Sequence, residues 1–132
     1  GSGKTTLGEL LANHFITHHH IDGDDMRKIF ANTNYTKVGR EHNIKTANAI
    51  AMYLNDAYYG SVIMSLVNPY YNLRKELADK TPTVQILLET SRDLRKENHC
   101  EDFETGEPDI CINTDGNEED TFNLLLSELG KL

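Results

Sequence analysis

Apolar residues recur at helical spacing near the start of the chain. Leu7, Leu11 and Phe15 mark one face of residues 4–15. Because residues three and four apart share a helix face, this spacing predicts an amphipathic helix. We also expect helices at residues 24–31, 41–58, 70–80 and 117–129. Asn117 can cap the last of these, and acidic residues occupy its first turn.

Short apolar runs separate these helices. They lie at residues 18–22, 61–67, 83–89 and 109–113. The runs are continuous rather than alternating, which is typical of parallel strands covered on both faces. Helix and strand alternate throughout, so the pattern predicts a three-layer α/β fold with a parallel sheet. Cys111 lies in the last run, and we expect its side chain to be buried in a strand.

Composition and charge narrow the class of protein. A chain of 132 residues suits one domain, residues 1–132, with a single core. Its net charge is −8, from 21 acidic and 13 basic residues, which argues against nucleic-acid binding. A local cluster of N–H groups and basic side chains can still bind a small anionic substrate. No apolar run is long enough for a membrane span, and two cysteines make no disulfide framework, so we expect a reduced, cytoplasmic protein.

The chain opens with "GSGKTT", in which Gly3, Lys4 and Thr5 match the second half of the phosphate-binding motif G-x-x-x-x-G-K-[ST]. In that motif, backbone N–H groups wrap the phosphates of ATP, and the lysine reaches the β- and γ-phosphates. The threonine hydroxyl binds Mg²⁺. The expected ATP site therefore consists of Gly1, Ser2, Gly3, Lys4, Thr5 and Thr6.

This stretch could also have a simpler origin. The letters "GSG" could be a cloning remnant, and Lys4 could be a solvated lysine at an ordinary helix start. Neither possibility accounts for "KTT" and an amphipathic helix following directly. We therefore expect a buried strand and the first loop glycines upstream of Gly1, roughly ten residues in all. Without that strand, the sheet would have a gap in its middle.

Two carboxylates, Asp22 and Asp24, lie at the end of the strand expected at residues 18–22. The carboxyl ends of parallel strands are where α/β proteins bind ligands. One acid could accept the proton of a substrate hydroxyl while the other orients a water on Mg²⁺. We prefer Asp22 for the first role, with Asp24 as the alternate, and Arg27 could bind an anionic substrate. The alternative is a simple turn, since Asp-Gly-Asp is also turn chemistry.

Three consecutive histidines, residues 18–20, suggest a metal site at first sight. Adjacent strand residues point to opposite faces, so three in a row cannot converge on one ion. We therefore interpret these histidines as strand residues.

Together, these stretches resemble the adenylylsulfate kinases, P-loop kinases that phosphorylate the 3′-hydroxyl of adenosine 5′-phosphosulfate with ATP and Mg²⁺. The matching segments are "GSGKTT", "IDGDDMRKIF", "NYTKVGREHNIK", "VIMSLVNPYYNLR" and "ICINTD". The resemblance implies a P-loop NTPase fold, with Lys4, Asp22 and Asp24 as catalytic residues and Thr5 and Asp22 as Mg²⁺ ligands. It also implies a substrate site made of Arg27, Tyr35, Arg40, Asn43, Asn68, Pro69 and Tyr70. In that site, the arginines and Asn43 would hold the phosphosulfate and ribose, and Tyr35 would stack on the adenine.

The chain also departs from the family pattern. Asp25 replaces an asparagine, Asn68 a serine and Tyr71 an arginine. The polar stretch 91–108 is a candidate lid, shorter than the family's, in which Phe103 is a candidate for an adenine-stacking aromatic. These departures leave two alternatives open: a kinase for another nucleotide or a sugar, and a non-catalytic nucleotide-binding module. A homodimer is also left open.

Overall fold

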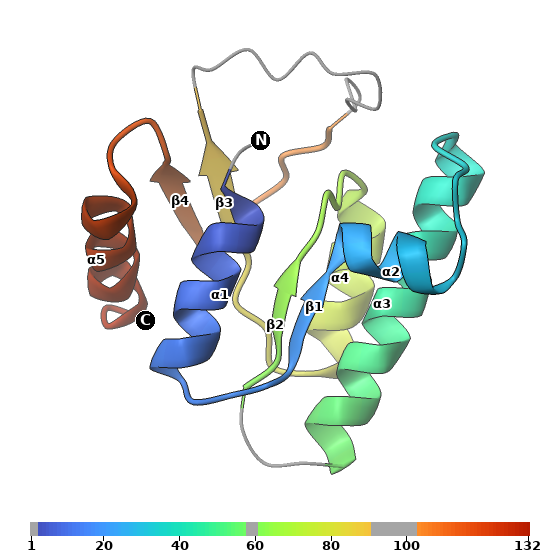
Figure 1. Cartoon of the computed structure of the whole chain (residues 1–132), viewed down its shortest axis with the longest axis horizontal. Helices are drawn as coiled ribbons and strands as arrows, with labels where there is room; N and C mark the ends of the chain where they lie inside the picture. The colour runs from blue at the N-terminus through green and yellow to red at the C-terminus, as the bar shows by residue number, and fades with distance from the viewer. Residues whose placement is uncertain (1–2, 58–60, 91–102) are drawn as a thin grey trace.

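The computed structural model describes residues 3–57, 61–90 and 103–132. Helices and strands alternate along the chain (Figure 1), in the order α1 (Lys4–His14), β1 (His20–Asp22), α2 (Gly23–Ile29), α3 (Lys37–Ala57), β2 (Ile63–Ser65), α4 (Tyr71–Lys80), β3 (Ile86–Glu89), β4 (Ile110–Asn113) and α5 (Glu118–Leu129). Every helix and strand expected from the pattern is present, and the α/β class is confirmed. None of the described helices combines the length and apolar character that a membrane span requires.

The strands are shorter than the apolar runs that predicted them. β1 begins at His20 rather than at residue 18. The reason lies in Thr17, whose hydroxyl donates to the carbonyl of Ser61 at 2.7 Å and accepts the amide of His19 at 3.1 Å. A side chain therefore joins the two segments just before the backbone ladder begins.

The described strands form two separate parallel sheets, β1 with β2 and β3 with β4. His20 pairs with Ile63, and Ile86 pairs with Ile110. A cavity of about 100 Å³ lies between the two sheets, and its lining includes Leu7, Leu11, Ile63, Ile86, Leu88 and Leu125. The single sheet expected from the pattern is thus interrupted between β2 and β3. This interruption agrees with the gap expected in the middle of the sheet. The strand expected upstream of Gly1, which would fill the gap, stays a prediction.

Helices lie on opposite sides of the β1–β2 sheet. Ile63 packs against a cluster that contains Leu11 of α1, whereas its neighbour Met64 packs against a cluster that contains Ala47 of α3. Because adjacent strand residues point to opposite faces, α1 and α3 cover opposite faces of this sheet (Figure 1). The three-layer arrangement expected from the sequence is therefore present.

The expectation for Cys111 was wrong, because its side chain is exposed. Buried and exposed residues alternate along β4, and the buried ones, Ile110 and Ile112, pack against Leu125 of α5. An apolar run predicts two covered faces, but α5 covers only one face of β4. Cys111 points to the other.

The cap expected for the last helix is confirmed. The side-chain oxygen of Asn117 accepts the amide of Asp120 at 2.8 Å. Acidic residues fill the first turn of α5, where they interact favourably with the helix dipole.

Candidate active site

A polar cleft of about 180 Å³ lies at the carboxyl end of β1 and β2, beside the start of α1. Four elements of the fold, α1, β1, α2 and β2, contribute to its lining, which consists of Gly3, Lys4, Thr5, Thr6, Asp22, Gly23, Asp24, Ser65 and Val67. The structure thus brings the half phosphate motif together with Asp22, the last residue of β1, and Asp24 in the first turn of α2. Gly1 and Ser2, the first two residues of the expected ATP site, lie outside the described residues.

Gly3 shapes the entrance to α1. Its φ is 90°, in the left-handed region that glycine adopts readily and other residues rarely do. Its carbonyl accepts the amide of Leu7 at 2.9 Å, and no side chain caps the helix at this position. The first-turn N–H groups of a helix have no partner within the helix and carry partial positive charge. The start of α1 is therefore suited to bind the phosphates of a nucleotide in the cleft.

Asp22 joins α1 to α2 through both of its carboxylate oxygens. Oδ1 accepts the hydroxyl proton of Thr5 at 2.6 Å. Oδ2 accepts the amides of Asp24 and Asp25 at 3.1 and 3.3 Å, so that Asp22 is the N-cap of α2. Because the only hydroxyl proton of Thr5 points to Asp22, the oxygen lone pairs of Thr5 remain available for a cation.

This pair of oxygen groups fits Mg²⁺. Magnesium is usually held by one or two protein oxygens, with substrate phosphates and waters completing the octahedron. Thr5 and Asp22 offer such a partial set of ligands beside the start of α1. Within the residues that the structure describes, no group of three or more histidine, cysteine or acidic side chains could hold a metal by itself. A metal held jointly with phosphates is the arrangement that these residues suit.

Asp24 lies on the same cleft but in a different environment. It is exposed, stands in the first turn of α2 and lines the cleft with its neighbour Gly23. Whereas both oxygens of Asp22 are engaged in fixing α1 and α2, no side-chain hydrogen bond of Asp24 is found within the described residues. Of the two carboxylates, Asp24 is the one with oxygens available to a substrate hydroxyl.

Arg27 and Arg40 converge on Tyr35, in the segment between α2 and α3. The guanidinium carbon of Arg27 lies 3.9 Å from the centre of the Tyr35 ring, and that of Arg40 lies 5.8 Å from it. Arg27 Nη1 also donates to the carbonyls of Asn32 and Asn34, at 3.0 and 3.1 Å. Arg40 Nε donates to the carbonyl of Tyr35 at 2.8 Å. The two arginines therefore also order this connecting segment.

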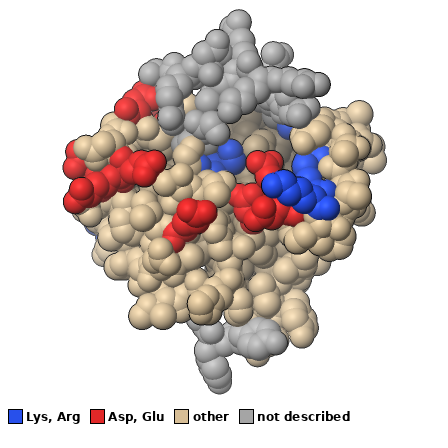
Figure 2. Space-filling model, viewed as in Figure 1, with Lys and Arg blue, Asp and Glu red and all other residues tan. Residues whose placement is uncertain are grey.

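Basic and acidic side chains are neighbours on this face of the molecule. Figure 2 shows them side by side at the right, where Figure 1 places α2 and the start of α3. A cationic patch next to acidic groups can bind the anionic part of a substrate in spite of the overall negative charge.

The remaining expected substrate residues have different surroundings. Asn43 is half-buried on α3, one turn after Arg40. Pro69 and Tyr70 are buried, and Tyr70 packs with Ile44 and Leu73. Asn68 is distinct, because its buried side-chain oxygen Oδ1 has no hydrogen-bond partner within the described residues. A buried acceptor of this kind is rare in folded proteins and marks a place where a ligand or water can donate a hydrogen bond.

Arg74 links this region to the end of the candidate lid. Its guanidinium donates to the carbonyl of Asn68 at 2.6 Å, to that of Glu104, and to that of Thr105 at 3.2 Å. Burial lowers the pKa of Arg74, while the charge of nearby Glu104 acts in the opposite direction. One guanidinium thus fixes the expected substrate segment and residues 103–106, which we call the strap.

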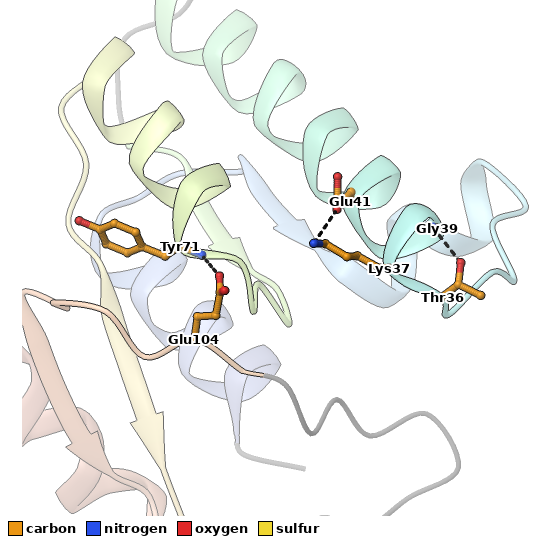
Figure 3. A network of polar contacts seen from close by, with 6 residues as sticks. All are labelled: Thr36, Lys37, Gly39, Glu41, Tyr71 and Glu104. Carbon is orange, nitrogen blue, oxygen red and sulfur yellow. Dashed lines mark hydrogen bonds and ion pairs between the residues drawn. The ribbon is translucent and has the colours of Figure 1, made fainter.

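The strap also binds the start of α4 directly. A carboxylate oxygen of Glu104 accepts the amide of Tyr71 at 2.8 Å, as Figure 3 shows, and the amide of Glu104 donates to the carbonyl of Pro69 at 2.8 Å. In the same view, Lys37 and Glu41 form an ion pair of 3.9 Å on α3. The residues of the candidate lid before Phe103 lie outside the described residues.

Sequence reasoning missed Arg74 and Glu104 as parts of this region. The two residues are 30 positions apart in the chain. Arg74 ends the matching segment "VIMSLVNPYYNLR" and Glu104 lies in the candidate lid, but no role was assigned to either, because a charged residue on the surface is normally solvated. The available signals were the place of Arg74 in that segment and its position about one turn after the helix start.

Comparison with known protein families agrees with the geometry of the cleft. The family model described as adenylylsulphate kinase matches residues 1–102. The chain belongs to the adenylylsulphate kinase family. Its members are ATP-dependent kinases, so the chain is an ATP-dependent phosphotransferase, and the resemblance found in the sequence is confirmed. No curated protein matches the chain.

Solved structures of this family share the fold. The adenosine phosphosulfate (APS) kinase CysC of Mycobacterium tuberculosis, in complex with AMPPNP and APS, matches with a TM-score of 0.78 and 16% identity, over 98% of this chain and 92% of that one. A cysteine-to-alanine mutant of the same enzyme matches with a TM-score of 0.74 and 17% identity, over 98% and 90%. These matches confirm the P-loop NTPase fold expected from the sequence.

Proposed function

We propose that the chain transfers the γ-phosphate of ATP to the 3′-hydroxyl of adenosine 5′-phosphosulfate. One observation carries the proposal: the start of α1, with Lys4 and Thr5, shares a single cleft with Asp22 and Asp24. Family membership supports a kinase, and the M. tuberculosis neighbour was solved with an ATP analogue and APS.

On the ATP side, first-turn N–H groups of α1 and the ammonium group of Lys4 bind the phosphates. Their positive charge stabilises the negative charge that spreads over the γ-phosphoryl group in the transition state. Thr5 and Asp22 hold Mg²⁺, which when bound neutralises phosphate charge. The hydrogen bond between Thr5 and Asp22 keeps both oxygen groups oriented toward the same place.

On the acceptor side, Asp24 accepts the proton of the attacking hydroxyl. This assignment reverses the sequence-based preference for Asp22, because both oxygens of Asp22 already hold other groups. Arg27 and Arg40 bind the phosphosulfate, and Asn43 contacts the ribose. The buried oxygen of Asn68 accepts a hydrogen bond from an amino group of the substrate.

Tyr35, Pro69 and Tyr70 support the acceptor site in different ways. The ring of Tyr35 has one face covered by Arg27, so a base stacks only on the other. The buried rings of Pro69 and Tyr70 shape the backbone beside Asn68 rather than offering surface to a ligand.

A panel of acceptors tests the proposal. The chain is incubated with ATP and Mg²⁺ together with adenosine phosphosulfate, AMP, adenosine or simple sugars, and both ADP and the phosphorylated product are measured. We expect kcat/KM to be highest for adenosine phosphosulfate and the Lys4→Ala variant to be folded but inactive, because it loses several kcal/mol of transition-state stabilisation. Product from a different acceptor alone would contradict the proposal.

A kinase with a different acceptor is the second candidate. The observation in its favour is that Asn68 and Tyr71 stand where the family has serine and arginine, and that both contact the Arg74–strap assembly. The same panel separates the two candidates. Cytoplasmic location, the homodimer and a lid at residues 91–108 stay predictions.

A further inference from the structure

We propose that His20 and Ser65 form a positioning pair that aligns the start of α1 for the phosphates of ATP. The inference rests on the proposed function, because it assumes that ATP binds at the start of α1. Neither residue was assigned a role by motif or resemblance, and His20 was expected to be only a strand residue. Ser65 lines the cleft and His20 does not, and the pair acts through the backbone of Lys4.

The pair forms a directed chain of hydrogen bonds. The hydroxyl of Ser65 donates to the carbonyl of Lys4 at 3.0 Å, and Nε2 of His20 lies 2.7 Å from the same hydroxyl oxygen. A serine hydroxyl has one proton, and here Lys4 receives it. This direction assigns Ser65 as the acceptor from His20, in the tautomer that carries a hydrogen on Nε2. Donation runs from His20 through Ser65 to the backbone of Lys4.

The sheet register places both side chains under α1. His20 pairs with Ile63 and Asp22 with Ser65, so His20 and Asp22 lie two residues apart on one face of β1. Asp22 binds the hydroxyl of Thr5, the residue after Lys4. Two consecutive residues of α1 are thus tied to the sheet, Lys4 through its backbone and Thr5 through its side chain.

Gly8 supplies independent support for the pair. A Cβ atom at this position would overlap with Ser65 Oγ and with Nε2 of His20. Glycine inside a helix is less favourable than alanine, yet it occupies the second turn of α1, where it is buried. The missing side chain provides the space through which the pair reaches Lys4. Ser65 itself is buried, at 6% exposure, so its hydrogen bonds are shielded from water.

The position of this hydrogen-bond chain indicates what it would do. Phosphate binding at a helix start depends on N–H groups that already point to the ligand. Donors that are aligned before binding lose less free energy to ordering than donors that must be arranged by the ligand. By holding the carbonyl of Lys4, the pair fixes the rotation of the first turn and hence the direction of its N–H groups.

Nucleotide affinity tests the pair without any acceptor. Binding of AMPPNP with Mg²⁺ to the full chain is measured by titration calorimetry, on the fraction shown to be folded by circular dichroism. We expect His20→Leu and Ser65→Ala to weaken binding roughly tenfold each, the effect of losing one well-aligned hydrogen bond. His20→Gln, which keeps an N–H donor, should bind nearly as wild type does.

The matched control is His18→Leu, a change at an exposed histidine two residues before His20. It should leave AMPPNP affinity unchanged. If the pair acts as one unit, the double variant His20→Leu with Ser65→Ala should be no weaker than either single variant. Affinities equal to wild type in both single variants would overturn the pair's role, as would lower thermal stability with unchanged affinity.

Amide hydrogen exchange distinguishes this inference from the proposed function. Without nucleotide, His20→Leu should speed exchange in the first turns of α1, and unchanged exchange would contradict the pair. A wild-type chain that binds no AMPPNP would contradict the proposed function and, with it, this role. Normal binding by wild type and by every variant would contradict the pair alone.

Discussion

At the scale of single residues, the two acids of the cleft have different roles. Asp22 uses both carboxylate oxygens to fix neighbouring elements, whereas Asp24, two residues later, keeps its oxygens available on the cleft. The sequence could place both acids at a strand end, because the motif and the apolar run fix that position. The sequence could not tell which of the two acids has oxygens available to a substrate, because the hydrogen bond from Thr5 to Asp22 joins residues 17 positions apart.

Asparagine substitutions separate these two roles. Asp24→Asn should lower kcat by about 100-fold or more, because it removes the proton acceptor, with little change in KM for ATP. Asp22→Asn should remain folded, since asparagine is also a good N-cap, but should need more Mg²⁺ for activity. Steady-state kinetics over a range of Mg²⁺ concentrations measure both. A higher Mg²⁺ requirement in Asp24→Asn instead would exchange the two assignments.

A substitution of Arg40 tests the proposed acceptor site. Arg40→Ala should raise KM for adenosine phosphosulfate about tenfold or more, because a charge-assisted hydrogen bond to the anion is lost. AMPPNP affinity should remain as in wild type. The control is Lys45→Ala, which removes an exposed positive charge from the same helix. Equal loss of affinity for both ligands would argue against a separate acceptor site.

At the scale of whole elements, Arg74 and Glu104 link the strap to α4. The guanidinium of Arg74 holds the carbonyls of Asn68 and Thr105, while Glu104 binds the amide of Tyr71. Asn68 and Tyr71, two departures from the expected family pattern, therefore meet residues 103–106 of the candidate lid at this one assembly. Local patterns predicted α4 correctly, but contacts between segments so distant in the chain leave no periodic signal.

The conservative change Arg74→Lys tests this link. Lysine keeps the charge but loses the planar fork, so the strap should detach from α4. We expect faster amide exchange at Tyr71 and a free energy of unfolding lower by about 1–3 kcal/mol. Lys75→Ala, which removes an exposed ion pair with Asp79, should change it by about 0.5 kcal/mol at most. Similar losses in both variants would mean that the fork of Arg74 has no special role.

Across the whole molecule, the sequence predicted which segments are helices and strands better than it predicted which faces of the strands are covered by helices. The alternation of helices and strands specified the α/β class, since periodicity reports local geometry. It did not reveal that α5 covers one face of β4 and leaves Cys111 on the other exposed, because an apolar run looks the same with one or two packed faces. Ile112 and Cys111 are adjacent in sequence and differ in burial for this reason.

Substitutions on the two faces of β4 test this difference in burial. Ile112→Ala should lower the free energy of unfolding by about 2–5 kcal/mol, because it leaves a cavity against Leu125. Cys111→Ala should change it by less than about 0.5 kcal/mol, since that side chain is exposed. Urea unfolding of both variants gives the comparison. A large loss in Cys111→Ala would show that a further element covers the second face of β4.

The central claim is that one cleft holds Mg²⁺, ATP and the acceptor. A crystal structure of the chain with AMPPNP, Mg²⁺ and adenosine phosphosulfate tests it most directly. We predict phosphates at the start of α1 beside Lys4, Mg²⁺ bound to Thr5 or Asp22, and the acceptor 3′-hydroxyl within hydrogen-bonding distance of Asp24. Phosphates bound away from the start of α1, or an acceptor distant from both carboxylates, would contradict the account.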